Sequence, residues 1–379
     1  MVRAGDRGFE SPQVRGRMNL KDKRTLSILA SVLFGVILIV VIFFKYPFRE
    51  VISTFTNFTP TLVLLYLIVS VLIMVTLSFR WKVILNALGH KIAFYKLFGY
   101  RVIGYGISYI TPSAKVGGEP VRAALLKRRG LSFKEGLSSV VIDKTLELSI
   151  SAFFFIAGVL LLVVAYAIPG EVLTVLIILS LIFLILVWIF YARILKGKPV
   201  FAPLFKLFRL HKFKFLSKYH NAILNFEKPI IHFYRTEKKA FFTAAALSIL
   251  SLALSMLEYK LVLLMLGINA PLGIVFVVLS LAGFAFMIPL PMALGSFEAF
   301  QASFFSIAKL GPPAAGIGVA MITRSRDLLW VLGALILSFY IGSFKNIIKK
   351  AFVDKPVLGV KLKRDGQKHT IDIKINRPR

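Results

Sequence analysis

The sequence predicts an all-α polytopic membrane protein with about six full transmembrane helices and two re-entrant pairs of broken helices. Apolar residues make up 58% of the 379-residue chain, and its mean hydropathy is +0.80, whereas soluble domains are nearer half apolar. Several uncharged runs reach about 18 residues, the length that spans a bilayer as a helix. Lys and Arg lie mainly between these runs and at the chain ends, as the positive-inside rule describes.

The strong positive charge points to membrane lipids rather than to nucleic acid. The formal net charge is +31, but the cations cluster beside apolar runs, where they attract anionic lipid head groups. The chain has no cysteine and five histidines, and these histidines lack metal-ligand spacing, so we expect no metal site. No P-loop pattern is present to bind ATP, and we expect no cofactor.

The first 25 residues form a basic segment without the small-residue cleavage site of a signal peptide. Gly8–Pro12 can be read as the translated T-arm of a tRNA gene, so we expect translation to start at Met18. Residues 1–17 would then be a gene-annotation artefact. Upstream DNA without the 3′ end of a tRNA gene would contradict this hypothesis.

Six apolar runs are long enough to cross the membrane in full. They are Leu26–Phe44, Pro60–Phe79, Leu137–Ala167, Val172–Tyr191, Phe241–Leu266 and Ala314–Gly342. With the segments between them they form a membrane domain over residues 26–344. Arg80 and Lys82 follow the second run and mark a cytoplasmic connection, and the same charge rule places both termini of this cell-membrane protein in the cytoplasm.

Two basic regions lie outside the apolar runs. Residues 193–239 are dense in Lys and Arg with interleaved Phe and Leu, which predicts one or two amphipathic helices on the cytoplasmic leaflet. Residues 345–379 form a basic cytoplasmic tail with a hairpin signal over 360–375. An isolated hairpin is marginal in water, so we expect this tail to be disordered.

The segment 97–130 predicts a helix that enters the membrane, breaks and returns. Helix-breaking residues interrupt it at Pro112, Gly117 and Gly118. Glu119 then favours a new helix start, and Gly130 a helix end. Because cations flank the segment on both sides, we expect both of its ends on the cytoplasmic face. A full crossing remains the alternative, although it would place the basic residues 127–129 outside.

A second broken region, 274–308, repeats this spacing. Pro112 precedes Glu119 by seven residues and Pro291 precedes Glu298 by seven, with a glycine-containing pair between them in both cases. In the expected topology the two regions enter from opposite faces, as in an inverted repeat. Irregular backbone at membrane depth is tolerated only inside protein or beside a wet cavity, so both breaks are candidate substrate sites.

Charges inside the apolar runs extend this candidate site. Arg324, Arg326 and Asp327 lie near the middle of the last span, where one charge costs about 2.5–3.5 kcal/mol on insertion scales. Glu258 of the preceding span is a natural partner for one of these arginines. The full candidate substrate site is Pro112, Gly117, Gly118, Glu119, Arg122, Pro291, Gly295, Glu298, Glu258, Arg324, Arg326 and Asp327. A secondary cluster at helical spacing is Asp143, Lys144 and Glu147.

Simpler structural roles remain open for several of these residues. Glu119 and Glu298 are also placed to cap their helices. Arg122 could snorkel to the interface, and the secondary cluster could be one internal salt-bridge group.

Several stretches resemble one family, the lysylphosphatidylglycerol synthetase transmembrane-region family of flippase-like proteins. They are PSAKVGGEPVRA, IPLPMALGSFEAF, the Arg80-Trp81 pair and the arginine of the last span. The resemblance covers roughly residues 26–350 and implies functional roles for Glu119, Arg122 and Glu298. In two-domain members a soluble synthase domain makes an aminoacyl lipid and the membrane part translocates it. These residues contain no such domain, so the resemblance does not extend to that substrate.

We therefore expect a translocase of a phospholipid or lipid-linked precursor, with anionic head groups as ligands. We do not expect an enzyme. A polyprenyl-dependent glycosyltransferase would want a carboxylate pair in an external loop, and residues 45–59 offer only Glu50. The other alternative is a non-transporting partner or regulator of a lipid or glycan synthase, which a transport assay would distinguish.

Overall fold

The structure, a computed structural model, describes residues 37, 44, 48–53, 58–111, 117–165, 170–201, 203, 220–286 and 290–341. Most of the expected first span, the basic segment 1–25, the tail 345–379 and Pro112 lie outside these residues. Within them every regular element is helical. The α-helices are α2 (Phe48–Ser53), α3 (Pro60–Ala87), α4 (Phe94–Ile110), α5 (Glu119–Leu126), α6 (Phe133–Ala165), α7 (Gly170–Leu195), α10 (His220–Thr236), α11 (Lys238–Met265), α12 (Leu272–Ala282), α13 (Ser296–Ile307) and α14 (Pro313–Tyr340). Short 3-10 helices are η1 (Lys127–Arg129), η3 (Gly283–Phe286) and η4 (Pro291–Ala293).

Four described helices are long and apolar enough to cross a membrane: α3, α6, α7 and α11. α14 has the same 28-residue length as α3, but it carries Arg324, Arg326 and Asp327 near its middle. At about 1.5 Å per residue, such a helix extends about 42 Å, more than the roughly 30 Å of the hydrocarbon core. The chain is thus an all-α, multi-pass membrane protein.

α3 extends from the expected end at Phe79 to Ala87 and closes before Gly89, which has a φ of 84°. Arg80 and Lys82 therefore lie within the helix rather than in a polar connection. Arg80 is only 1% exposed. The helix can continue through Arg80 because two carboxylates, one of them fully buried, neutralise its charge, as described below.

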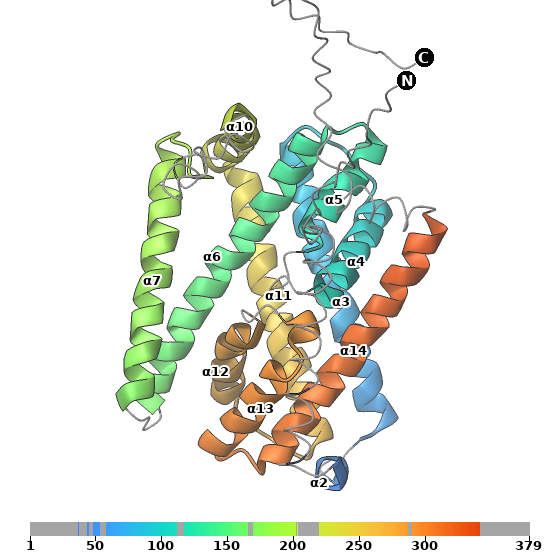
Figure 1. The fold of residues 1–379 in the computed structure, drawn as a ribbon, viewed down its shortest axis with the longest axis vertical. Coiled ribbons are helices and arrows are strands. Elements are labelled where there is room, and N and C mark those ends of the chain that lie inside the picture. Colours follow the sequence, from blue (N-terminus) through green and yellow to red (C-terminus); the bar gives the residue numbers. More distant parts are fainter. Residues whose placement is uncertain are drawn as a thin grey trace, which may run out of the picture.

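α3 and α11 pack against each other at the centre of the bundle. α4 and α5 lie toward the end near α10, drawn at the top of Figure 1, and α12 and α13 lie toward the end near α2. We call these the α10 end and the α2 end. The two broken pairs thus occupy opposite ends of the bundle. Gly130 closes the first pair with a φ of 85°, as the sequence predicts.

α7 lies at the edge of the bundle, beside α6 and α10 (Figure 1). None of its apolar window is buried inside the protein, which leaves that surface to lipid. By contrast, the main core joins α3, α6, α11, α12, α13 and α14 through buried side chains such as Tyr259, Met265 and Phe305.

α10 covers one end of the bundle within the predicted basic region 193–239. The buried Glu227 carboxylate accepts hydrogen bonds from the backbone N–H groups of Val200 and Phe201, both at 2.6 Å. The hydroxyls of Tyr234 and Thr145 are 2.7 Å apart. α10 is therefore attached both to α6 and to the chain that follows α7.

Candidate functional site

The first break depends on two glycines that bring α4 and α5 close together. The Gly118 N–H donates to Ser108 Oγ at 2.8 Å. A Cβ at Gly118 would lie 1.9 Å from the Gly104 carbonyl oxygen, so a larger residue would push the helices apart. Gly117 and Gly118 form the turn before α5, which begins at Glu119 with Pro120 in its first turn, as predicted.

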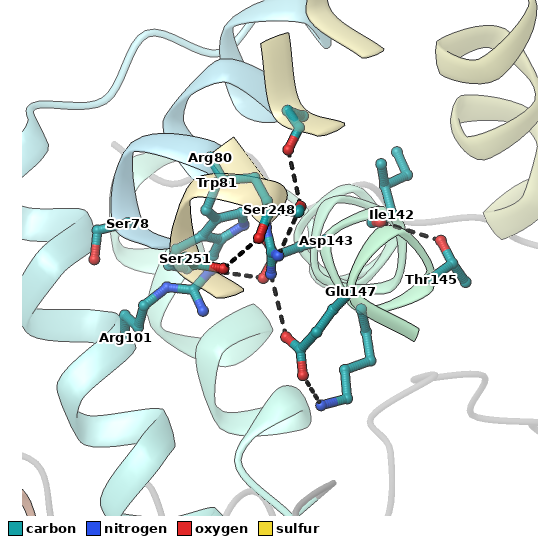
Figure 2. A network of polar contacts seen from close by, with 12 residues as sticks. Ser78, Arg80, Trp81, Arg101, Ile142, Asp143, Thr145, Glu147, Ser248 and Ser251 are labelled. Carbon is teal, nitrogen blue, oxygen red and sulfur yellow. Dashed lines mark hydrogen bonds and ion pairs between the residues drawn. The ribbon is translucent and has the colours of Figure 1, made fainter. Parts of the chain in front are cut away.

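Asp143 of α6 lies among three arginine side chains. Its carboxylate accepts hydrogen bonds from Arg80 at 2.7 Å, Arg101 at 2.6 Å and Arg122 at 2.8 Å. The Asp143 side chain is fully buried, at 0% exposure. Figure 2 shows Arg80 and Arg101 beside it. Because the arginines come from α3, α4 and α5, one carboxylate links four helices.

Other side chains hold these arginines in place. Arg80 also donates to Glu147 at 3.2 Å and to Ser248 of α11 at 3.1 Å (Figure 2). The Arg122 guanidinium carbon lies 4.1 Å from the centre of the Trp81 ring, within cation–π range. The guanidinium groups of Arg80 and Arg122 are thus each held by more than one neighbouring side chain.

Lys144 and Glu119 border the same group of charges. The Lys144 ammonium lies 2.6 Å from Glu147 and 4.0 Å from Glu119. Glu119 also accepts a weak hydrogen bond from Ser108 at 3.4 Å. The Glu119 carboxylate is therefore held loosely, in contrast to Asp143.

A cavity of about 190 Å³, here called the head-group cavity, opens beside these residues. Its polar lining includes Arg101, Tyr105, Ser108, Glu119, Arg122 and Lys144. The Nε atoms of Arg101 and Arg122 are buried and have no hydrogen-bond partner within the described part of the chain. An unpaired charged donor is costly to bury. A single water needs only about 10–15 Å³ by the same kind of measure, so a much larger polar group has room here.

Arg324 of α14 holds the second break. It forms a two-point ion pair with Glu298 of α13. Its guanidinium also donates to the carbonyl oxygens of Met292 at 2.5 Å and Ala293 at 2.9 Å, and to the Tyr109 hydroxyl at 3.2 Å. One side chain therefore joins α13, the irregular backbone before it, and α4.

The backbone of the second break is strained where Arg324 contacts it. Met292 and Ala293 have φ values of 56° and 49°, a backbone conformation that residues other than glycine rarely adopt. Gly295 follows with a φ of 79°, and its N–H donates to Glu298 at 2.9 Å. Glu298 therefore caps its helix and pairs with Arg324 at the same time. Pro291 begins the short helix η4.

Arg326 lies between two carboxylates. It donates to Asp327 at 2.6 Å and forms an ion pair with Glu258 of α11, which confirms the predicted partnership of Glu258. The Tyr105 hydroxyl donates to the same Asp327 oxygen at 2.6 Å. One Glu258 oxygen is buried without a hydrogen-bond partner in the described residues.

The charged residues thus form two clusters of opposite excess charge in their ordinary ionised states. The Asp143 cluster is Arg80, Arg101, Glu119, Arg122, Asp143, Lys144 and Glu147, four cations against three carboxylates. The Arg324 cluster is Glu258, Glu298, Arg324, Arg326 and Asp327, two cations against three carboxylates. Tyr105 and Tyr109 line the head-group cavity and bond to the Arg324 cluster. The two tyrosines therefore connect the lining of the cavity to the Arg324 cluster.

Sequence reasoning missed Arg80 and Arg101 as members of the site. The sequence does contain a signal for Arg101, because a single arginine inside an apolar run needs a buried partner. Arg122 is 5% exposed and bonds to Asp143, so the snorkelling alternative is wrong. The secondary cluster contains the expected Lys144–Glu147 pair, but Asp143 pairs with distant arginines. No group of three or more His, Asp or Glu in the described residues is arranged to hold a metal.

This chain is similar in sequence to a known protein family and to several membrane proteins. Residues 28–336 match the family described as Lysylphosphatidylglycerol synthase TM region. A UPF0104 membrane protein of Methanocaldococcus jannaschii is 34% identical over 143 residues, 36% of this chain and 40% of that protein's length. One of Methanothermobacter thermautotrophicus is 23% identical over 310 residues, 78% of this chain and 89% of that protein. Since the family match covers well over half of the residues, the chain belongs to the lysylphosphatidylglycerol synthase transmembrane-region family.

Proposed function

We propose that this protein translocates a phospholipid or a lipid-linked precursor across the cell membrane and catalyses no covalent chemistry. The observation that carries the proposal is the head-group cavity inside a membrane domain, whose lining brings together the side chains of Arg101, Arg122 and Lys144. Arginine is well suited to phosphate because its planar fork matches the phosphate oxygens. The single excess positive charge of the Asp143 cluster matches the single negative charge of a phosphodiester.

A second cavity favours a lipid over a soluble anion. This apolar cavity of about 450 Å³ is lined by residues of α3, α11 and α14, among them Leu67, Met265 and Arg326. Arg326 contacts Asp327, and Asp327 in turn bonds to Tyr105 in the head-group cavity. An acyl chain and a polar head group would thus bind on opposite sides of this chain of contacts.

The α10 end is the cytoplasmic side in this proposal. The exposed cations of η1 lie at the exit of the first broken pair and would attract anionic lipid head groups over a short distance. The carboxylates of Glu119 and Glu147 would bind a head-group amine or a proton while the phosphate is held by arginine. Both termini are cytoplasmic in this orientation.

The test is translocation in proteoliposomes that carry a fluorescently acyl-labelled phosphatidylglycerol, with dithionite added outside to quench exposed lipid. Arg122→Gln should slow translocation by about tenfold or more, because a charged hydrogen bond is worth roughly 1.5–3 kcal/mol. Lys134→Gln, which removes an exposed cation near the same end, is the matched control and should retain the parent rate.

Two results would contradict the proposal. One is an Arg122→Gln rate equal to the parent rate in protein that elutes as a single species. The other is a parent rate no higher than that of empty liposomes, which would favour a non-transporting partner of a lipid or glycan synthase.

A further inference from the structure

The two halves of the described chain correspond at several positions. Near its end α3 contains Arg80-Trp81-Lys82 followed by Gly89, and α11 contains Glu258-Tyr259-Lys260 followed by Gly267 at the same spacing. Both glycines have positive φ, 84° and 74°. Each is followed by a helix, a break, a short helix and a long helix, which are α4, α5 and α6 in one half and α12, α13 and α14 in the other.

Contacts between helices also correspond. Arg122 follows Glu119 by three residues, as Gln301 follows Glu298. Trp81 stacks on Arg122, and its counterpart Tyr259 donates to Gln301 at 2.8 Å. The Arg122 Nε and the Gln301 Nε2 are both buried without a partner in the described residues.

Two further pairs of contacts lie in similar places, although the glycine contacts differ by one residue in register. A Cβ at Gly136 would lie 2.9 Å from the Ala123 oxygen of α5, and one at Gly316 would lie 2.4 Å from the Gln301 oxygen of α13. Eight residues after each glycine comes a cation, Lys144 or Arg324. Each forms an ion pair with the glutamate in the first turn of the short helix of its own half, Glu119 or Glu298.

The corresponding groups also differ in how far they are closed. Lys144 and Glu119 are 4.0 Å apart beside a cavity of about 190 Å³. Arg324 and Glu298 form a two-point ion pair, and the cavity beside the second break measures only about 10 Å³. The molecule is thus open at the first break and closed at the second.

We propose that Glu298, Gln301 and Arg324 form a second head-group site, equivalent to Glu119, Arg122 and Lys144, which the Glu298–Arg324 pair closes in this state. For its ligand, a phosphate-bearing lipid head group, the inference rests on the proposed function. In the opposite state Glu298 and Arg324 separate while Glu119 and Lys144 pair. Gln301 supplies a neutral donor where the first site has an arginine, so the second site holds an anion less tightly and suits release.

The test uses single cysteines in a chain that has none of its own. Leu77 lines the head-group cavity, and its counterpart three residues before Glu258 is Ser255. Leu77→Cys and Ser255→Cys are each introduced into the parent, Glu298→Gln, Glu119→Gln and Glu171→Gln chains. The labelling rate with a charged methanethiosulfonate reagent is then measured on purified protein. Glu171 is exposed at the start of α7 and serves as the control position.

Glu298→Gln should raise labelling of Ser255→Cys about tenfold and lower that of Leu77→Cys, because the charge-assisted pair no longer favours the closed second site. The glutamine oxygen can still accept from Gly295, which preserves the cap. Glu119→Gln should have the reverse effect, and Glu171→Gln none. Millimolar glycerol phosphate should slow labelling of Ser255→Cys in the Glu298→Gln chain.

The proposal fails if Glu298→Gln leaves both rates unchanged, raises both together, or gives no protection by glycerol phosphate. Arg324→Gln breaks the same pair from its other side and replaces Glu298→Gln if that variant does not elute as a single species. The labelling needs no lipid transport. If the two labelling rates change in opposite directions but no lipid is translocated, only the proposed function is contradicted. If lipid is translocated but the labelling rates do not change in this way, only this inference is contradicted.

Discussion

The Tyr105 hydroxyl donates a 2.6 Å hydrogen bond to Asp327, which lies 222 residues later in the chain. Tyr105 lines the head-group cavity, whereas Asp327 belongs to the Arg324 cluster. This hydrogen bond therefore connects the wall of the head-group cavity, beside the first break, to the charged residues at the second break.

Tyr105→Phe should lower the stability of the protein by about 1.5–3 kcal/mol, because it removes a hydrogen bond to a charged acceptor. The measurement is thermal unfolding in detergent, followed by intrinsic fluorescence. Tyr95→Phe is the control, since Tyr95 is 70% exposed. Equal midpoints for both variants would show that the Tyr105 hydroxyl contributes nothing to stability.

Asp143→Asn should be more damaging, by about 3–5 kcal/mol, because it leaves three buried arginines without their shared counter-charge. Asparagine keeps the size of the side chain, so the effect isolates the charge. The free energy of unfolding in detergent would be compared with that of Glu171→Gln, which removes an exposed carboxylate. A loss no larger than in that control would contradict the role assigned to Asp143.

Sequence patterns predicted the parts of this site that depend on local chemistry. Helix-breaking residues placed both interruptions, and the charge of Arg326 inside an apolar run required a partner, which is Glu258. The Asp143 cluster could not be predicted in this way. Arg80 and Asp143 are 63 residues apart, and their pairing depends on how α3 packs against α6. The boundary of α3 was misplaced for the same reason, since only that packing makes Arg80 compatible with a buried helix.

Gly316→Ala and Gly99→Ala should have effects of opposite sign on stability. At Gly316 a Cβ would lie 2.4 Å from a backbone oxygen of α13, so the helices must separate at a cost of about 1–3 kcal/mol. At Gly99, inside α4, nothing lies within 4 Å of the added atom, and alanine should stabilise the helix by about 0.5–1 kcal/mol. Thermal unfolding of both variants tests this, and a stabilised Gly316→Ala protein would contradict the close packing.

Glu227→Gln should loosen the attachment of α10. The carboxylate accepts from two backbone N–H groups, and a glutamine offers one oxygen and a repelling NH₂ group in its place. Hydrogen exchange at Val200 and Phe201 should then speed up by about tenfold, the equivalent of roughly 1.4 kcal/mol. Lys228→Gln, which changes the exposed neighbour, should leave that exchange unchanged.

Most of the tight glycine contacts define two blocks of helices, and the contact between Gly104 and Gly118 joins the two blocks at the first break. A Cβ at Gly136 would strike α5, and one at Gly158 on the same helix α6 would strike Ser280 of α12. In the same way Gly316 of α14 fits against α13, and Gly106 of α4 fits against α14. Each block therefore combines helices from both halves of the chain. The chain crosses from one block to the other within each broken pair, so any rocking of the blocks would bend it at the two breaks, beside the charges of both clusters.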